Sequence, residues 1–171
     1  PKEFSIYLFN KKNSNNLYKN KIKFNDNKDY VDLDILDKFL ENNIFKIEKL
    51  AGTFIKKIFL IIESNENSQI SFGIKKKYYE NIIRKNLLQN ILTDAKDLFK
   101  ENYQNHYIMH MLITRYFENG NYHLYYNDEF SGDYLCIEFQ FKYISSNLIS
   151  EINKVLKKYQ VELAGCIDGL Y

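Results

Sequence analysis

An α+β fold with an α/β-like order of elements is predicted for this 171-residue chain, on three observations. Apolar residues recur at intervals of three and four in three separate stretches, which is typical of amphipathic helices. A nearly continuous apolar run at 55–64 is rich in β-branched residues and indicates a strand buried on both faces. Apolar and polar residues alternate at 134–143, which indicates a strand with one buried and one wet face.

The first third of the chain predicts a hairpin, a helix and a strand. Residues 4–24 hold two apolar, aromatic stretches around a turn rich in Lys, Asn and Ser, which favours a β-hairpin. The helical spacing begins after Asp32 or Asp34, either of which can cap the helix, and stops before Gly52. With the strand at 55–64, the order of elements is β-β-α-β.

The remaining residues predict five elements in the order β-α-β-β-α, followed by a last strand. No repeat, low-complexity tract or Pro-rich linker separates them. A Tyr-rich connection at 120–133 joins the two central strands. The predicted elements are a strand at 70–74, a helix at 86–100, strands at 106–120 and 134–143, a helix from Ser145 or Ser146 to Tyr159, and a strand at 161–171.

Composition and charge place the chain among ordered globular proteins. Hydrophobic residues make up 45% and charged residues 27%, whereas disordered chains are poorer in hydrophobic residues. The net charge of +2 permits nucleic-acid binding without implying it. Cys136 and Cys166 fall in strand-like apolar runs, which favours small buried thiols in a reducing cytosol. No apolar run approaches the roughly 20 residues that span a bilayer, so we expect a cytoplasmic protein.

The three histidines, His106, His110 and His123, do not predict a metal site. His106 and His110, four apart on a strand, would share a face but lie ~13 Å apart at ~3.3 Å per residue, too far apart for one ion. Paired carboxylates such as Asp32 and Asp34 lie where helix starts favour acidic residues. The sequence holds no nucleophile elbow, no Cys–His pattern and no glycine-rich phosphate loop. We therefore expect no enzyme, no catalytic residue, no cofactor and no bound metal.

Two clusters of aromatic residues are the candidate partner-binding sites. The basic-aromatic stretch at 74–79 is either a solvated rim or a binding patch. The aromatic residues in the polar segment at 119–133 are either a lid packed over the core or side chains presented to a partner, since interfaces favour Tyr and Phe. The candidate residues are Lys75, Lys76, Lys77 and Tyr78 in the first cluster, and Tyr122, Tyr125, Tyr126 and Phe130 in the second.

Several longer segments carry a family resemblance. The helix "VDLDILDKFLENNIFKIEKLAG" at 31–52 ends like "ERMAG", and "YIMHMLITRYFENG" at 107–120 follows the pattern "ILHVIPQEYxIDG", with His110 in register. The stretch "FSGDYLCIEFQFKYIS" at 130–145 is similar to "LSGxRLEVxVHIVT", and 148–171 is similar to the helix and return strand that follow. These patterns are typical of FtsA, a family of actin-like bacterial cell-division proteins that carry an inserted SHS2-type subdomain. The chain resembles this family over most of its length.

The resemblance implies two small lobes. Residues 1–62 and 160–171 would form a partial actin/RNase H-like sheet, and residues 63–159 an inserted SHS2-type β-α-β-β-α subdomain. At 7–13 the sequence "YLFNKKN" replaces the family's Asp-x-Gly phosphate loop, so no nucleotide is implied. The implied function is a non-catalytic protein–protein interaction module in divisome assembly. Its partners would be cell-division proteins, or a second copy through an edge strand, and the cytoplasmic protein would be recruited to the division site at the inner membrane.

Nucleic-acid binding by an α+β protein is the alternative function, from a different class. Basic and aromatic strand residues can stack bases and contact the phosphates of a single strand. The spread of aromatic residues weighs against this alternative, because most of them alternate into the predicted core. An enzyme with an unrecognised site is a third interpretation.

Overall fold

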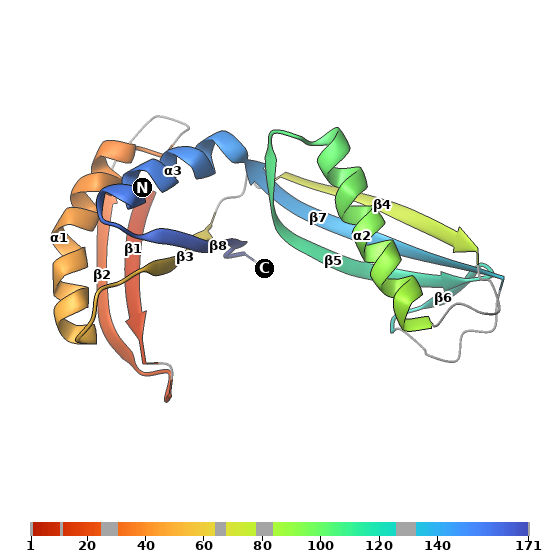
Figure 1. The fold of residues 1–171 in the computed structure, drawn as a ribbon, viewed down its shortest axis with the longest axis horizontal. Helices are drawn as coiled ribbons and strands as arrows, with labels where there is room; N and C mark the ends of the chain where they lie inside the picture. The colour runs from red at the N-terminus through yellow and green to blue at the C-terminus, as the bar shows by residue number, and fades with distance from the viewer. Residues whose placement is uncertain are drawn as a thin grey trace. The chain divides into compact units, whose positions relative to one another are not determined.

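The computed structural model describes residues 2–10, 12–24, 31–63, 68–77, 84–125 and 133–170. This part of the chain contains three helices and eight strands, and the strands form small sheets. This composition confirms the α+β prediction (Figure 1). Among these residues no helix has the length and apolar character needed to cross a membrane. The elements in chain order are β1 (Lys2–Phe9), β2 (Asn16–Phe24), α1 (Leu33–Ala51), β3 (Lys57–Ile62), β4 (Ser68–Lys77), α2 (Arg84–Asn102), β5 (His106–Glu118), β6 (Asn121–His123), β7 (Tyr134–Ser145), α3 (Ser146–Lys158) and β8 (Glu162–Asp168).

The chain divides into two compact units, each built from two separate segments. The first unit comprises Pro1–Leu60 and Ser150–Gly165, and the second comprises Ile61–Ile149 and Cys166–Tyr171. Most of α3 therefore belongs to the first unit, whereas the expected boundary assigned this helix to the inserted subdomain. Both β3 and β8 begin in the first unit and end in the second.

In the first unit, α1 packs along one face of the β1–β2 hairpin. The strands pair in an antiparallel register that places Phe4 opposite Ile22. The rings of Phe4 and Phe39 of α1 lie with their centroids 6.3 Å apart, and Figure 1 shows the helix alongside the hairpin. The buried face of α1 holds Phe39, Leu40, Asn43, Ile44 and Ile47, at the spacing of three and four that predicted the helix.

Both ends of α1 are fixed by local chemistry, as the sequence predicts. Asp32 is the N-cap, and its side chain accepts hydrogen bonds of 3.1 Å from the backbone N–H groups of Asp34 and Ile35. Gly52 ends the helix with a φ of +68°, a left-handed conformation that favours glycine. Such caps satisfy backbone groups that a helix leaves unpaired at its ends, and for this reason they mark its boundaries.

Polar contacts join α3 to α1 within the first unit. The hydroxyl of Tyr159, just beyond α3, donates to Oδ1 of Asp37 at 2.7 Å. The Nζ atom of Lys158 lies 2.6 Å from Oδ2 of the same carboxylate. These hydrogen bonds hold the pKa of Asp37 below its usual value, with Lys158 as the main cause. One carboxylate on α1 therefore anchors the C-terminal end of α3.

β3 and β8 form a two-stranded parallel sheet. The N–H of Glu162 donates to the carbonyl of Lys56 at the start of the pair, and the N–H of Gly169 donates to the carbonyl of Ile62 at its end. The prediction that 55–64 is buried on both faces is wrong. Two strands with one covered face leave Phe59 and Ile61 exposed, at 71% and 56% of their surface. A continuous apolar run therefore does not by itself require two covered faces.

The second unit is an antiparallel sheet with one face covered by α2. The strand order is β4-β7-β5-β6, and Figure 1 shows α2 lying across these strands. The rings of Phe99 on α2 and Phe141 on β7 stack with their centroids 4.9 Å apart. The apolar half of the alternation at 134–143 is buried against the helix, as predicted. The core consists of Leu87, Ile91, Ala95 and Phe99 from α2 and Leu135, Ile137, Phe139 and Phe141 from β7.

The prediction that His106 and His110 share a strand face is wrong. His106 lies opposite Ser145 of β7, whereas His110 lies opposite Lys142, so four steps along β5 match three steps along β7. The register shifts just before His110, and Met109 is the extra residue. A one-residue β-bulge reverses the alternation of side chains that follows it. The two histidines therefore face opposite sides of the sheet.

The connection after β5 begins with a strand that the sequence analysis did not assign. Asn119 and Gly120 have φ values of +46° and +86°, as the two central residues of a type I′ hairpin turn require. The chain then returns along β5 as β6, with Asn121 opposite Glu118. Part of the segment at 119–133 is therefore a hairpin and not a free loop.

Candidate functional site

β4 lies at the edge of its sheet in the part of the chain that the structure describes. Its ten residues pair with β7 without a register shift, from Ser68 opposite Tyr143 to Lys77 opposite Tyr134. In the described part of the chain no strand pairs with its other side. Every second residue of such a strand points its N–H and C=O groups away from the sheet, where another strand can bind. β4 therefore offers the backbone pattern for strand addition.

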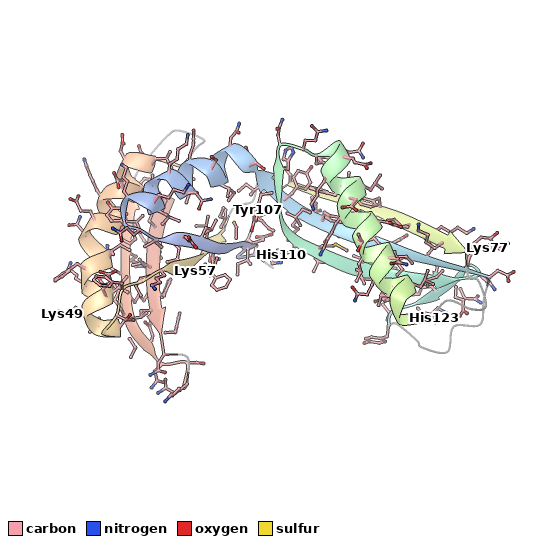
Figure 2. The ribbon with its side chains drawn as sticks, viewed as in Figure 1. Lys49, Lys57, Lys77, Tyr107, His110 and His123 are labelled. Carbon is pink, nitrogen blue, oxygen red and sulfur yellow. The ribbon has the colours of Figure 1, made fainter. Side chains whose placement is uncertain are left out.

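The three lysines at the end of β4 have different surroundings. Lys76 faces α2, and its Nζ lies 2.6 Å from Oδ2 of Asp94, so this lysine ties the strand to the helix. The Nζ of Lys75 lies 4.3 Å from the centroid of the Tyr134 ring on the other face of the sheet. Lys77 is exposed at the end of the strand, as Figure 2 shows. Lys75 and Lys77 are thus placed to meet a partner, whereas Lys76 has a structural role.

The exposed aromatic residues of the second cluster lie on and after β6. Tyr122 is 51% exposed, and its ring centroid lies 5.9 Å from that of Phe117 on β5. Tyr125 is 82% exposed. Both residues line an open hollow together with His123 and Leu124. Tyr122 is thus half packed on the sheet, and Tyr125 is presented outward. Three of the predicted residues lie outside the described part of the chain: Tyr78, Tyr126 and Phe130.

The strand register brings residues of the two clusters onto one face. Lys75 of β4 lies opposite Cys136 of β7, which lies opposite Phe117 of β5, which in turn lies opposite Tyr122 of β6. This row faces away from α2, because Leu135 and Ile137, the neighbours of Cys136 along β7, are buried in the core with residues of α2. A partner strand along β4 would therefore meet Lys75 directly, whereas Phe117 and Tyr122 lie two and three strands farther across the sheet.

The thiol in the row is poorly suited to nucleophilic chemistry. Burial raises the pKa of Cys136, and the nearby Glu138 carboxylate adds to the shift. The thiol is therefore protonated at neutral pH, whereas catalytic cysteines have a lowered pKa. Burial also raises the pKa of Cys166 on β8, to about 11. Both cysteines are free thiols, as predicted, although only Cys166 is fully buried.

A polar cluster ties the end of β8 to the sheet of the second unit. Asp168 is 3% exposed, and its Oδ2 lies 2.8 Å from Nζ of Lys142 on β7. The N–H of Asp168 donates a 2.9 Å hydrogen bond to Nε2 of His110, and its Oδ1 accepts one of 3.0 Å from the N–H of Leu170. Structural partners thus occupy these groups. Nowhere in the described ranges do three or more His, Cys, Asp or Glu side chains come together in a way that could hold a metal ion.

Reasoning from the sequence missed this polar cluster and the Lys76–Asp94 pair. Asp168 carries a weak signal, because a carboxylate inside an apolar strand needs a buried partner. Nothing in the spacing identifies Lys142 as that partner, since the two residues lie 26 positions apart. The β5–β6 hairpin was also missed, although its sequence signal is stronger. Asn119 and Gly120 follow a strand, and an Asn-Gly pair in that place is typical of a hairpin turn.

Comparisons with known proteins add no family to this description. No protein-family model matches the chain, and the search of curated proteins gives no match. The candidate site therefore consists of the edge strand and the adjoining row of side chains.

Proposed function

We propose that the chain is a non-catalytic protein-interaction module that takes up a strand of a partner protein along β4. The observation that carries the proposal is the free side of this ten-residue edge strand. Main-chain hydrogen bonds supply affinity in such a complex, and alternate side chains supply specificity. Lys75 and Lys77 limit indiscriminate pairing, because charged side chains on an edge strand oppose aggregation.

The order of elements supports an FtsA-like architecture. β4, α2, β5, β7 and α3 follow one another in the β-α-β-β-α order that the resemblance implies for the SHS2-type insertion, with the short β6 added. β3 and β8, which flank this segment in the chain, pair with each other, as strands of a lobe that receives an insertion would. On this proposal the partner is a bacterial cell-division protein or a second copy of the chain, and no nucleotide is needed.

The test is binding of the purified chain to a panel of cell-division proteins and to itself, measured by biolayer interferometry. Two variants probe the edge, Ser68→Pro and Ser71→Pro, because proline has no N–H to give to an added strand. Successive residues of a strand direct their N–H groups to alternate sides, and the register of β4 has no shift. One of these two N–H groups therefore faces the free side.

The variant at that position should keep the circular dichroism spectrum of the parent and lose partner binding by at least about tenfold, or ~1.4 kcal/mol. Alanine at the same position is the matched control and should bind like the parent, because it keeps the N–H. Two results would contradict the proposal. One is that the chain binds no member of the panel and does not self-associate. The other is a folded, outward-facing proline variant that binds like the parent.

A further inference from the structure

The N-terminal hairpin concentrates positive charge. Residues 1–24 hold six lysines and one acidic residue, a net charge of +5. The whole chain carries +2, so the other 147 residues sum to −3. Charge separated in this way favours a polyanionic ligand at the hairpin. The lysines are Lys2, Lys11, Lys12, Lys19, Lys21 and Lys23.

The register of the hairpin sorts its side chains onto two faces. Phe4 faces α1, so Tyr7 and Phe9, at odd-numbered steps from it along β1, face the other way. Tyr7 lies opposite Lys19, and the alternation along β2 places Lys21 on the same side. We call this side, with Tyr7, Phe9, Lys19, Lys21 and Lys23, the outer hairpin face.

Two aromatic rings lie side by side on the outer hairpin face. The centroids of Tyr7 and Phe9 are 6.1 Å apart with an angle of 13° between the ring planes. Tyr7 is 44% exposed and Phe9 55% exposed, so each ring keeps a surface free for a ligand. The Nζ of Lys19 lies 5.2 Å from the centroid of Tyr7. Parallel, exposed rings flanked by cations are suited to stacking on flat, electron-rich groups that carry negative charge nearby.

One carboxylate only partly balances the lysines of this face. Glu3 lies 3.5 Å from Nζ of Lys21 and 3.9 Å from Nζ of Lys23. The lysine side chains are 51% and 61% exposed and can turn toward a ligand. With Lys19, the outer hairpin face carries three cations and one anion, so a net positive charge remains beside the rings.

We propose that the outer hairpin face binds single-stranded nucleic acid. Unpaired bases stack on Tyr7 and Phe9, and phosphates of the same strand contact Lys19, Lys21 and Lys23. A double helix does not fit this arrangement, because its base faces are covered by their neighbours. An acidic peptide would use the lysines but leave the rings without stacking partners. This inference is independent of the proposed function, since it rests on the first unit and not on β4.

The test is fluorescence anisotropy of a labelled oligonucleotide of about 12 thymidines, and of an equivalent oligouridine, at about 50 mM salt. Micromolar binding is expected, and the logarithm of affinity should fall with the logarithm of salt concentration with a slope of about −2, for three phosphate contacts. Tyr7→Ala combined with Phe9→Ala should weaken binding by about 10-fold or more without changing this slope, because stacking does not release counterions. Lys19→Gln combined with Lys21→Gln should reduce the slope.

Matched controls and competitors keep the result interpretable. Phe54, 79% exposed, and Lys57, with a 67% exposed side chain, lie outside the hairpin, so Phe54→Ala combined with Lys57→Gln should bind like the parent. All variants are checked for parental circular dichroism. Four results would overturn the inference: no binding at low salt, equal binding by the double aromatic variant, equal or tighter binding of duplex DNA, or displacement of the oligonucleotide by polyglutamate or by phosphatidylserine vesicles at equal charge.

Discussion

The backbone N–H of Asp168 donates a hydrogen bond of 2.9 Å to Nε2 of His110, which joins the end of β8 to β5. The bulge at Met109 makes this contact possible, because it turns His110 to the face on which Lys142 lies. His110 therefore acts as an acceptor for backbone structure. It is a part-buried residue of the strand face and has no role in the proposed binding surface.

Replacing His110 with alanine should lower the free energy of unfolding by about 1–2 kcal/mol, because the N–H of Asp168 loses its acceptor. His110→Gln keeps an acceptor oxygen on a side chain of similar length and should cost less. Urea unfolding of the parent and both variants measures the difference. An alanine variant as stable as the parent would show that this hydrogen bond contributes nothing.

Breaking the buried ion pair of Lys142 and Asp168 should lower the free energy of unfolding more than replacing His110 does. Lys142→Met leaves the carboxylate of Asp168, whose side chain is 1% exposed, without this cation. The expected cost is about 3–5 kcal/mol. Adding Asp168→Asn removes the buried charge and should recover a large part of the loss. A double variant no more stable than Lys142→Met would mean that the charge of Asp168 is not what destabilises the single variant.

Tyr159 predicts a dependence of stability on alkaline pH. Burial raises its pKa to about 12, and the hydrogen bond to Asp37 adds to the shift. In the unfolded chain the phenol ionises near pH 10. The stability that Tyr159 contributes is therefore full below about pH 10 and is lost as the pH rises from there toward about 12. The gap in unfolding free energy between the parent and Tyr159→Phe should narrow over this range. If the difference in unfolding free energy stays constant over this pH range, ionisation of Tyr159 does not affect stability.

Replacing Asn43 with an apolar residue should destabilise the protein, although Asn43 lies on the apolar face of α1. It is 1% exposed, and its Oδ1 accepts hydrogen bonds from the hydroxyl of Tyr18 at 2.6 Å and the amide of Asn20 at 2.7 Å. Asn43→Leu leaves both donors without this acceptor, at a cost of about 2–3 kcal/mol. Adding Tyr18→Phe removes one donor and should recover part of the cost. Thermal unfolding followed by circular dichroism tests both variants, and a neutral Asn43→Leu would refute the network's role.

Elements whose signals are local could be predicted from the sequence. Asp32 and Gly52 bound α1 because both caps act within a few residues of the helix ends. The alternation at 134–143 also predicted the buried side of β7, because successive side chains of a strand point to opposite faces and the apolar ones mark the buried face. The strand predicted at 70–74 lies within β4, but β4 begins at Ser68 and continues through the three lysines to Lys77. Only the fold shows which lysine pairs with Asp94.

Features that depend on distant residues could not be predicted. The bulge at Met109 follows from how β5 pairs with β7, and the apolar run around it fits either register. The exposure of Phe59 depends on how many layers cover the β3–β8 pair, which an apolar run does not encode. The outer hairpin face was missed because its aromatic residues and lysines lie on different strands and meet only when the hairpin forms.

The most direct test of the proposed function is amide hydrogen exchange along β4, recorded by NMR with and without the bound partner. In the free protein the amides of alternate residues, those facing the free edge, should exchange rapidly, while the others are protected by pairing with β7. Addition of the cell-division protein that binds, or concentration of the chain until it self-associates, should slow exchange at the rapidly exchanging positions of Ser68–Lys77 by about tenfold or more. Protection confined to other elements, with every second amide of β4 still exchanging rapidly in the complex, would contradict the account.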